Sequence, residues 1–231
     1  MLTDEESAAL LLSLKVSLWA VAAMLPPGIA LGWLLARRRF PGKSLVEAMV
    51  HLPLVLPPTV TGYCLLLLLG RNGWLGRWLA ELFGITLSFN WKGAAAAAAV
   101  MSFPLLVQAV KLAMSLVEPR LEQAAATLGA GPTRVFLTVT LPLAAPGILT
   151  GTILSFARSV GEFGATITFV GNVEGQTRTL PLAFFTYTQS VDGEQPALRL
   201  LVISVLLAFA ALLGSEWLGR RLQRRLAGER A

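Results

Sequence analysis

Charge is scarce in this chain: Asp, Glu, Lys and Arg together supply 14% of its 231 residues. Soluble domains carry about a quarter charged residues, so the shortage excludes an ordinary soluble domain. Hydrophobic residues make up 55% of the chain, which is enough to fill several long apolar segments. The composition therefore indicates an integral membrane protein.

Cysteine and histidine are almost missing. Cys64 is the only cysteine and His51 is the only histidine. A single cysteine cannot form a disulfide within the chain, and one Cys with one His is too few for a zinc site. We therefore expect no metal site, and a packing or interface role for His51.

The motifs of nucleotide binding and catalysis are also missing. The chain has no Gly-x-x-x-x-Gly-Lys-Ser/Thr phosphate loop, no His-Glu-x-x-His and no Gly-x-Ser-x-Gly. No nucleophile is paired with a base in any pattern that we locate. The sequence thus predicts no catalytic residue and no cofactor bound by this chain, so any energy from ATP must come through a separate ATPase.

Long apolar stretches are what the chain does have. Crossing a bilayer takes about 20 mostly apolar residues. Five stretches meet this requirement, and they cover residues 10–36, 45–70, 93–117, 141–170 and 198–218. The expected fold class is all-α: a polytopic transmembrane helical bundle in which residues 1–231 form a single domain and residues 118–140 form a long loop.

Lys and Arg are concentrated on one side of this arrangement. That side would hold Arg37, Arg38, Arg39, Lys43, Arg120, Arg134, Arg220, Arg221, Arg224, Arg225 and Arg230. Basic loops remain in the cytoplasm, so the N-terminus is expected outside and the C-terminus inside, with the loop 118–140. This placement accounts for the net charge of +6 without nucleic acid. The Arg-rich tail is expected to meet anionic lipid headgroups.

Prolines interrupt the second stretch. Pro57 and Pro58 remove backbone donors in the middle of an apolar segment and should bend it. In lipid, such breaks occur mainly where helices pack together or where water enters. The segment 54–62 is then either a kink that serves packing or an element of a transport pathway, with Thr59 and Thr61 supplying hydroxyl groups.

The fourth stretch holds two charges at membrane depth. Arg158 and Glu162 are four residues apart, hence on one face of a helix. They either neutralise each other and fix helix packing, or Arg158 helps an anion past while Glu162 holds the arginine in place. Small residues also recur at every fourth position, at Gly147, Gly151, Ser155 and Ser159. This pattern favours close helix packing, although the Ser155 hydroxyl could add a neutral donor to a pathway.

A conspicuous motif lies between the third and fourth stretches. It consists of Gln123-Ala124-Ala125, then Gly129, Val139 and Leu141-Pro142. The spacing resembles the cytoplasmic "EAA" loop of bacterial ABC-importer permeases, in which Glu stands in place of Gln123 and Ile in place of Val139. Glu122 lies one position early and could substitute for that Glu. The resemblance implies a short helix from Gln123 to Gly129 whose face, with Ala124, Ala125 and Leu128, enters a groove on an ATPase.

Further motifs resemble the oxyanion branch of these permeases, and molybdate importers above all. They are Leu52 to Val60, Leu69 to Gly76, Pro119 to Ile148 and Gly161 to Thr166. The likeness spans roughly residues 10–218. It implies the type I permease fold and a place in a bacterial or archaeal cytoplasmic membrane, with transport of molybdate, or alternatively of tungstate or sulfate.

The resemblance also implies the partners and the mechanism. A second copy of the chain, two cytoplasmic ATPase subunits carrying ATP and Mg, and an extracytoplasmic oxyanion-binding protein would complete an alternating-access importer. The Arg158–Glu162 pair would then lie near the two-fold axis of the dimer. Two other classes stay open: a passive anion channel, which would not need the 123–129 loop, and a membrane enzyme, which would need a catalytic cluster.

Overall fold

The computed structural model describes the backbone of residues 2–226 and the side chains of residues 2–221. All regular structure within residues 2–226 is helical, which confirms the predicted fold class. Four helical segments are long and apolar enough to cross a membrane. They are α1 (Asp4–Arg37), α5 (Trp91–Leu116), the run Pro132–Val160 that ends in α8 (Leu141–Val160), and α11 (Glu194–Leu226).

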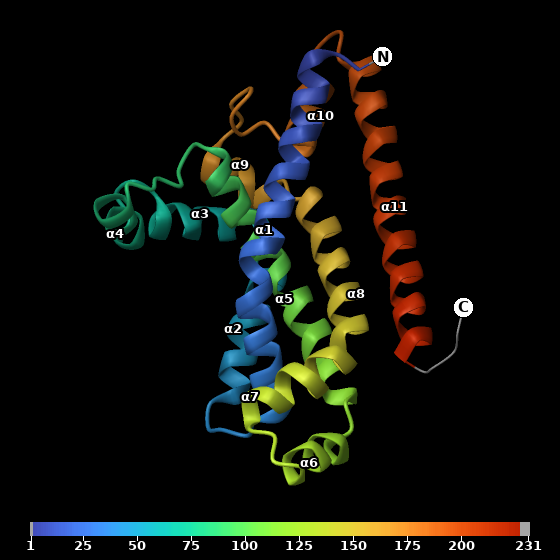
Figure 1. Cartoon of the computed structure of the whole chain (residues 1–231). Helices are drawn as coiled ribbons and strands as arrows, with labels where there is room; N and C mark the ends of the chain where they lie inside the picture. Colours follow the sequence, from blue (N-terminus) through green and yellow to red (C-terminus); the bar gives the residue numbers. More distant parts are fainter. Residues whose placement is uncertain (1, 227–231) are drawn as a thin grey trace.

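Helices α1, α5 and α8 form the centre of the bundle (Figure 1). Small side chains on α5, among them Ala94, Ala97 and Ala98, are fully buried against α1 and allow the two backbones to approach closely. Helix α11 lies on the outside, against α8 and the short α10 (Leu180–Thr188). The predicted stretch 93–117 agrees with α5 to within two residues.

An ion pair at one end of the bundle holds α11 to α1. The Glu6 side chain is fully buried and accepts hydrogen bonds from Nε and Nη2 of Arg199 at 3.0 and 2.7 Å. Glu6 also closes the N-terminus of α1 by accepting from the Thr3 backbone N–H at 2.9 Å. The N-terminal ends of α1 and α11 are therefore fixed to each other.

The bend that Pro57 and Pro58 predict in the stretch 45–70 is present. Two helices, α2 (Lys43–Val55) and α3 (Pro58–Leu69), meet at an angle of 114°. Leu56 is extended because it precedes Pro57, and Pro58 cannot donate a backbone hydrogen bond. Helix α3 therefore runs across the bundle toward the amphipathic α4 (Trp74–Phe83), an element not predicted from the sequence (Figure 1).

The predicted fourth stretch, 141–170, is not one helix, and its helical run starts earlier than predicted. The helical run begins with α7 (Pro132–Val135), continues through the π-helix η1 (Phe136–Thr140) and becomes α8. Pro142 has no N–H to offer the Thr138 carbonyl, and the wider turn lets the Leu141 N–H donate to the Phe136 carbonyl instead. The run stops at Val160, and after a short break α9 (Gly164–Val170) begins in a new direction.

The stripe of small residues on α8 faces α5. A Cβ atom on Gly147 would lie 2.6 Å from the Cβ of Ala113, and one on Gly151 would lie 2.3 Å from the Cβ of Ala109. Ser159 Oγ continues the contact through a hydrogen bond of 2.8 Å with Ser102 Oγ. The stripe is therefore the surface on which α8 packs.

We expect Gly151→Ala to destabilise the bundle by about 1–3 kcal/mol, because the added methyl group forces α8 away from α5. Gly214→Ala on α11 is the matched control, since a Cβ there would meet nothing within 4 Å. Thermal unfolding of the detergent-solubilised protein should show a lower midpoint for Gly151→Ala and an unchanged or higher one for Gly214→Ala. Equal midpoints for the two variants would contradict this account of the packing.

Candidate functional site

The predicted docking loop contains a helix, α6 (Pro119–Thr127), so the prediction of a helix over Gln123–Gly129 placed its start four residues too late. Pro119 occupies the first helical position, where its fixed φ suits the helix and its missing N–H is not needed. The helix ends at Thr127. Gly129 then adopts a φ of +87°, the left-handed conformation expected of a glycine that terminates a helix. The Ala130 N–H donates to the Ala125 carbonyl at 3.1 Å and completes the cap.

Helix α6 lies at the end of the bundle where α7 and the α1–α2 connection also lie (Figure 1). Each of its nine residues is exposed or half-buried. The apolar face that was predicted to enter a groove is open: Ala124 is exposed, Ala125 is half-buried and Leu128 is 89% exposed. An exposed apolar face on a protruding helix can be buried in a hydrophobic groove of a partner.

The neighbouring Gln123 and Glu122 face different surroundings. Gln123 is exposed, whereas Glu122 turns toward the bundle. Glu122 Oε1 accepts from Arg37 Nη2 at 3.1 Å and from the Thr140 hydroxyl at 2.6 Å. The carboxylate is therefore bound within the chain itself.

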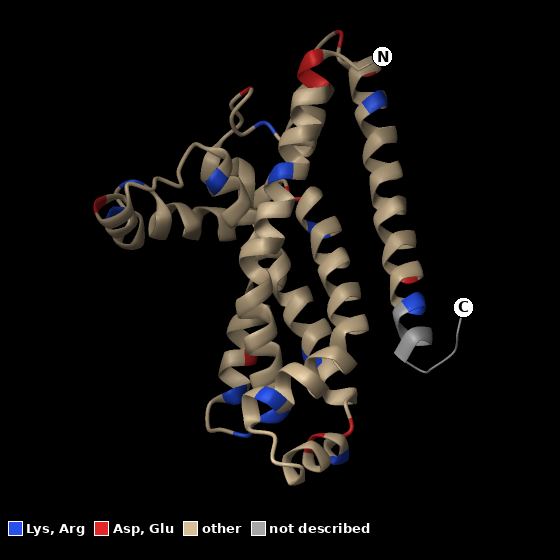
Figure 2. Cartoon of the chain, in the orientation of Figure 1, with Lys and Arg blue, Asp and Glu red and all other residues tan. Residues whose placement is uncertain are grey.

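Basic residues surround this end of the molecule (Figure 2). Arg37, Arg38, Arg39 and Lys43 lie at the α1–α2 connection, and Arg120 and Arg134 lie on α6 and α7. This grouping is the one from which a cytoplasmic location was predicted. The orientation in the membrane stays a prediction.

The Arg158–Glu162 pair is formed in the structure, with Arg158 Nη1 2.8 Å from Glu162 Oε2. Glu162 is 3% exposed, and its other oxygen accepts from the Ala165 N–H at 2.9 Å. The carboxylate thus also caps the N-terminus of α9, a role that sequence spacing did not reveal. The Arg158 side chain is 31% exposed. Glu162 is therefore buried within the chain, whereas Arg158 reaches the surface.

The break after α8 brings the two predicted pathway segments together. A Cβ on Gly164 would lie 2.7 Å from the Cβ of Pro58, and one on Gly62 would lie 2.5 Å from the Ala165 carbonyl oxygen. Helix α3 and the first residues of α9, which follow Glu162, are therefore in direct contact, although about a hundred residues separate them.

The three predicted hydroxyl donors lie in different surroundings. Thr59 is exposed, at the start of α3. Thr61 Oγ1 and Ser155 Oγ are buried and have no hydrogen-bond partner among the described residues. Of these three residues, only Thr59 is therefore exposed.

A polar cluster between α2 and α5 was missed from the sequence. Lys111 Nζ lies 2.6 Å from Glu47 Oε1, His51 Nδ1 donates to the Glu47 carbonyl oxygen at 2.6 Å, and the other ring nitrogen of His51 contacts the Gln108 amide. All four side chains are partly or fully exposed in the isolated chain. The available signal was the presence of Glu47 and Lys111 inside apolar stretches, because charges there tend to face water or another subunit.

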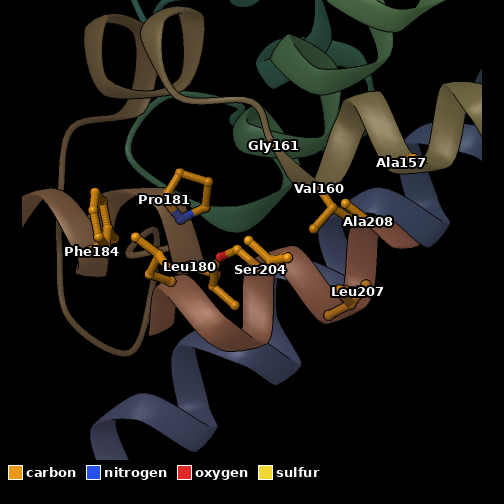
Figure 3. Close-up of a pocket in the computed structure, with 11 residues that line it drawn as sticks. Ala157, Val160, Gly161, Leu180, Pro181, Phe184, Ser204, Leu207 and Ala208 are labelled. Carbon is orange, nitrogen blue, oxygen red and sulfur yellow. The ribbon is translucent and has the colours of Figure 1, made fainter. Parts of the chain in front are cut away.

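A cavity of about 370 Å³ opens between α8, α10 and α11 (Figure 3). Its lining includes Val160, Leu180, Phe184 and Leu201, and Ser204 is the one polar side chain among the lining residues. The Ser204 hydroxyl already donates to the Leu200 carbonyl. These walls lack the donors that a dianion needs, so the cavity is not a candidate anion site. Within residues 2–221, no group of three or more His, Cys, Asp or Glu side chains could hold a metal ion.

Comparison with known sequences identifies the relatives of this chain. Residues 28–226 match the family described as "Binding-protein-dependent transport system inner membrane component". The molybdenum transport system permease protein ModB of Escherichia coli K12 is 59% identical over 219 residues, which cover 95% of this chain and 96% of that protein. ModB of Haemophilus influenzae is 50% identical over 221 residues, 96% of each chain. The sulfate transport system permease protein CysT of Escherichia coli K12 is 39% identical, over 87% of this chain and 72% of CysT.

Solved structures of ABC transporters share the fold. A chain of the MetNI methionine ABC transporter in an inward-facing conformation superposes with a TM-score of 0.72 at 18% identity, covering 96% of this chain and 99% of that one. A chain of a bacterial ABC transporter for alginate superposes with a TM-score of 0.74 at 16% identity, covering 95% of this chain and 80% of that one. The arrangement of helices in this chain is therefore the one found in these ABC transporter chains.

Proposed function

Because the chain belongs to the family of binding-protein-dependent transport system inner membrane components, we propose that it is the membrane-spanning subunit of an ATP-driven molybdate importer. The observation that carries the proposal is the 59% identity to the ModB permease over 95% of the chain. Identity at this level across nearly the whole length leaves little room for a different overall architecture. The chain acts as a transport subunit and leaves ATP hydrolysis to a partner.

Helix α6 is the feature that supports the proposal of an ATPase partner. It is a protruding helix with an exposed leucine at its tip and a left-handed glycine that fixes the tip's position. ATP and Mg would be held by the ATPase, because the chain has no phosphate-binding loop. An extracytoplasmic oxyanion-binding protein would deliver the anion at the opposite end of the bundle.

A second copy of this chain would complete the pathway. The side chains of the Glu47–Lys111 pair, Gln108 and Arg158 are partly or fully exposed on helices expected to lie in the membrane. Charged groups in contact with lipid tails are costly, so these side chains should face the second copy and the water between the two. The pathway would thus be lined by α2, α3, α5 and the loop after α8, with Arg158 and Thr59 meeting the anion and Glu162 holding the arginine.

Transport by this arrangement is alternating access. ATP binding would close the two ATPase subunits and bring the two α6 helices together, which would open the pathway toward the binding protein. A dianion would enter, and weak binding to one arginine per chain would allow its release after hydrolysis resets the pathway inward. Arg158, whose charge is balanced by Glu162, should bind the anion more weakly than a cluster of free arginines would, and weak binding allows release.

Molybdate is favoured over sulfate by the relatives. Permeases named for molybdenum are 59% and 50% identical to this chain, whereas the permease named for sulfate is 39% identical. Tungstate has the same charge and shape as molybdate, and we expect it to share the pathway.

The proposal predicts rescue of a cell that has lost its own molybdate uptake. Expression of this chain with its cognate ATPase and binding protein should restore molybdenum accumulation at low external molybdate. Excess tungstate should suppress that accumulation, and equal sulfate should leave it largely intact. Restoration of sulfate uptake instead of molybdenum accumulation would contradict the assignment.

A further inference from the structure

The docking helix α6 is held to the membrane-embedded body by few side chains. All nine of its residues are exposed or half-buried, and it packs on α7 and η1. A partner that displaces such a helix moves the rest of the chain only through the contacts that hold it. Glu122 makes the most extensive of the polar contacts.

One oxygen of Glu122 joins three elements. Oε1 accepts from Arg37, the last residue of α1, and from Thr140, the last residue of η1. The same Arg37 Nη2 also donates to the Val117 carbonyl at 2.8 Å, and Val117 is the residue that ends α5. The carboxylate therefore links α6 to α1 and α8, and its partner guanidinium fixes the end of α5.

The contact is shielded from water. The Arg37 and Glu122 side chains are 17% and 22% exposed, and Thr140 is buried. Shielding makes charge-assisted hydrogen bonds stronger and less sensitive to salt. The Glu118–Arg120 pair at the start of the same helix offers a contrast: its charged atoms are 3.8 Å apart, and the Glu118 and Arg120 side chains are 59% and 88% exposed. Pairs of that kind contribute little.

We propose that Glu122 is a positioning residue that transmits movement of α6 to α1 and α8, while the exposed Gln123 and Leu128 face the ATPase. The inference rests on the proposed function and adds to it the route by which the ATPase moves the pathway. The resembled motif has Glu at the position of Gln123, and Glu122 lies one position earlier. In this proposal Glu122 acts within the chain and does not substitute for a charge at position 123. Thr140 is the last residue of the π-helix η1. The wide turn of a π-helix departs from the hydrogen-bond pattern of an α-helix, and such turns often occur at functional sites.

The test uses the complete transporter in proteoliposomes, with ATP hydrolysis and molybdate uptake measured on the same sample. Glu122→Ala should keep the ATPase bound and hydrolysing, yet raise the ATP consumed per molybdate by about tenfold, within the range typical of coupling between sites. Thr140→Val should give a smaller rise, because Arg37 still holds the carboxylate. Exchanging the charges, with Arg37→Glu and Glu122→Arg in one chain, should recover much of the coupling.

Glu118→Gln is the matched control, since it removes a carboxylate from the exposed pair on the same helix, and it should leave the ratio unchanged. A parallel fall in hydrolysis and uptake by Glu122→Ala would overturn the proposal, because general damage lowers both together. An unchanged ratio in Glu122→Ala, or a rise as large in Glu118→Gln, would overturn it as well. Failure of the unmodified transporter to take up molybdate would instead overturn the proposed function.

Discussion

Replacing Gly129 by valine should abolish ATPase association and coupled uptake while leaving insertion in the membrane intact. Gly129 has a φ of +87°, and this left-handed conformation costs an L-residue about 1–2 kcal/mol, with more expected for a β-branched side chain. The helix cap would open, and the exposed Leu128 next to it would lose its place on the docking surface. Co-purification with the ATPase and molybdate uptake in vesicles measure the two effects.

Gly131→Val is the matched control for this prediction. A Cβ at either glycine would meet nothing within 4 Å, so the variants differ chiefly in backbone conformation. Gly131 has an ordinary φ of −67° and should tolerate valine. Gly129→Asn should retain much of the activity, because asparagine adopts the left-handed region more readily than valine. Gly129→Asp should be impaired, because it adds a negative charge at the negative end of the α6 dipole. Normal uptake by Gly129→Val would remove the loop from the mechanism.

Arg158→Ala should lower uptake more than the double change of Arg158→Ala with Glu162→Ala. Removal of one partner from a buried pair costs about 3–5 kcal/mol, and the partial exposure of Arg158 places the expected loss at the low end. Glu162 would keep the hydrogen bond from the Ala165 N–H but would remain charged at membrane depth. The double variant removes that charge as well.

Uptake by reconstituted vesicles and thermal unfolding should be measured together for both variants. The single variant is expected to lose stability and transport, and the double variant should recover stability while transport remains below that of the unmodified chain. Recovery of both by the double variant would assign the pair to packing. Negligible effects of both variants would contradict any role of the pair at the pathway.

The class of fold and the position of the docking segment could be predicted from the sequence because both depend on residues that are close together in the chain. Long apolar stretches without charge specify membrane helices, which is why α5 was predicted almost to the residue. Gly129, the predicted end of the docking helix, adopts the left-handed conformation that commonly follows a helix C-terminus. The start of α6 was missed because the helix was placed on the motif residues from Gln123, whereas Pro119 suits the first helical position.

Other features depend on contacts between distant residues and could not be predicted. Hydropathy places α2 and α3 in one apolar stretch, and contacts with the distant α9, such as that of Gly62 with Ala165, fix where α3 goes after the bend. The spacing of Arg158 and Glu162 predicted their pair, but the hydrogen bond from Ala165 to Glu162 requires the helix break at Gly161. Likewise, Glu47 and Lys111 are 64 positions apart, and periodicity within one helix cannot bring them together.

The central claim is that this chain forms an ATP-driven pathway for molybdate. The most direct test is uptake of labelled molybdate by proteoliposomes that contain the purified chain, its cognate ATPase and its binding protein. We predict accumulation inside the vesicles that requires both ATP and the binding protein. Equilibration of molybdate without ATP, which a passive channel would give, or hydrolysis of ATP with no molybdate uptake, would contradict the claim.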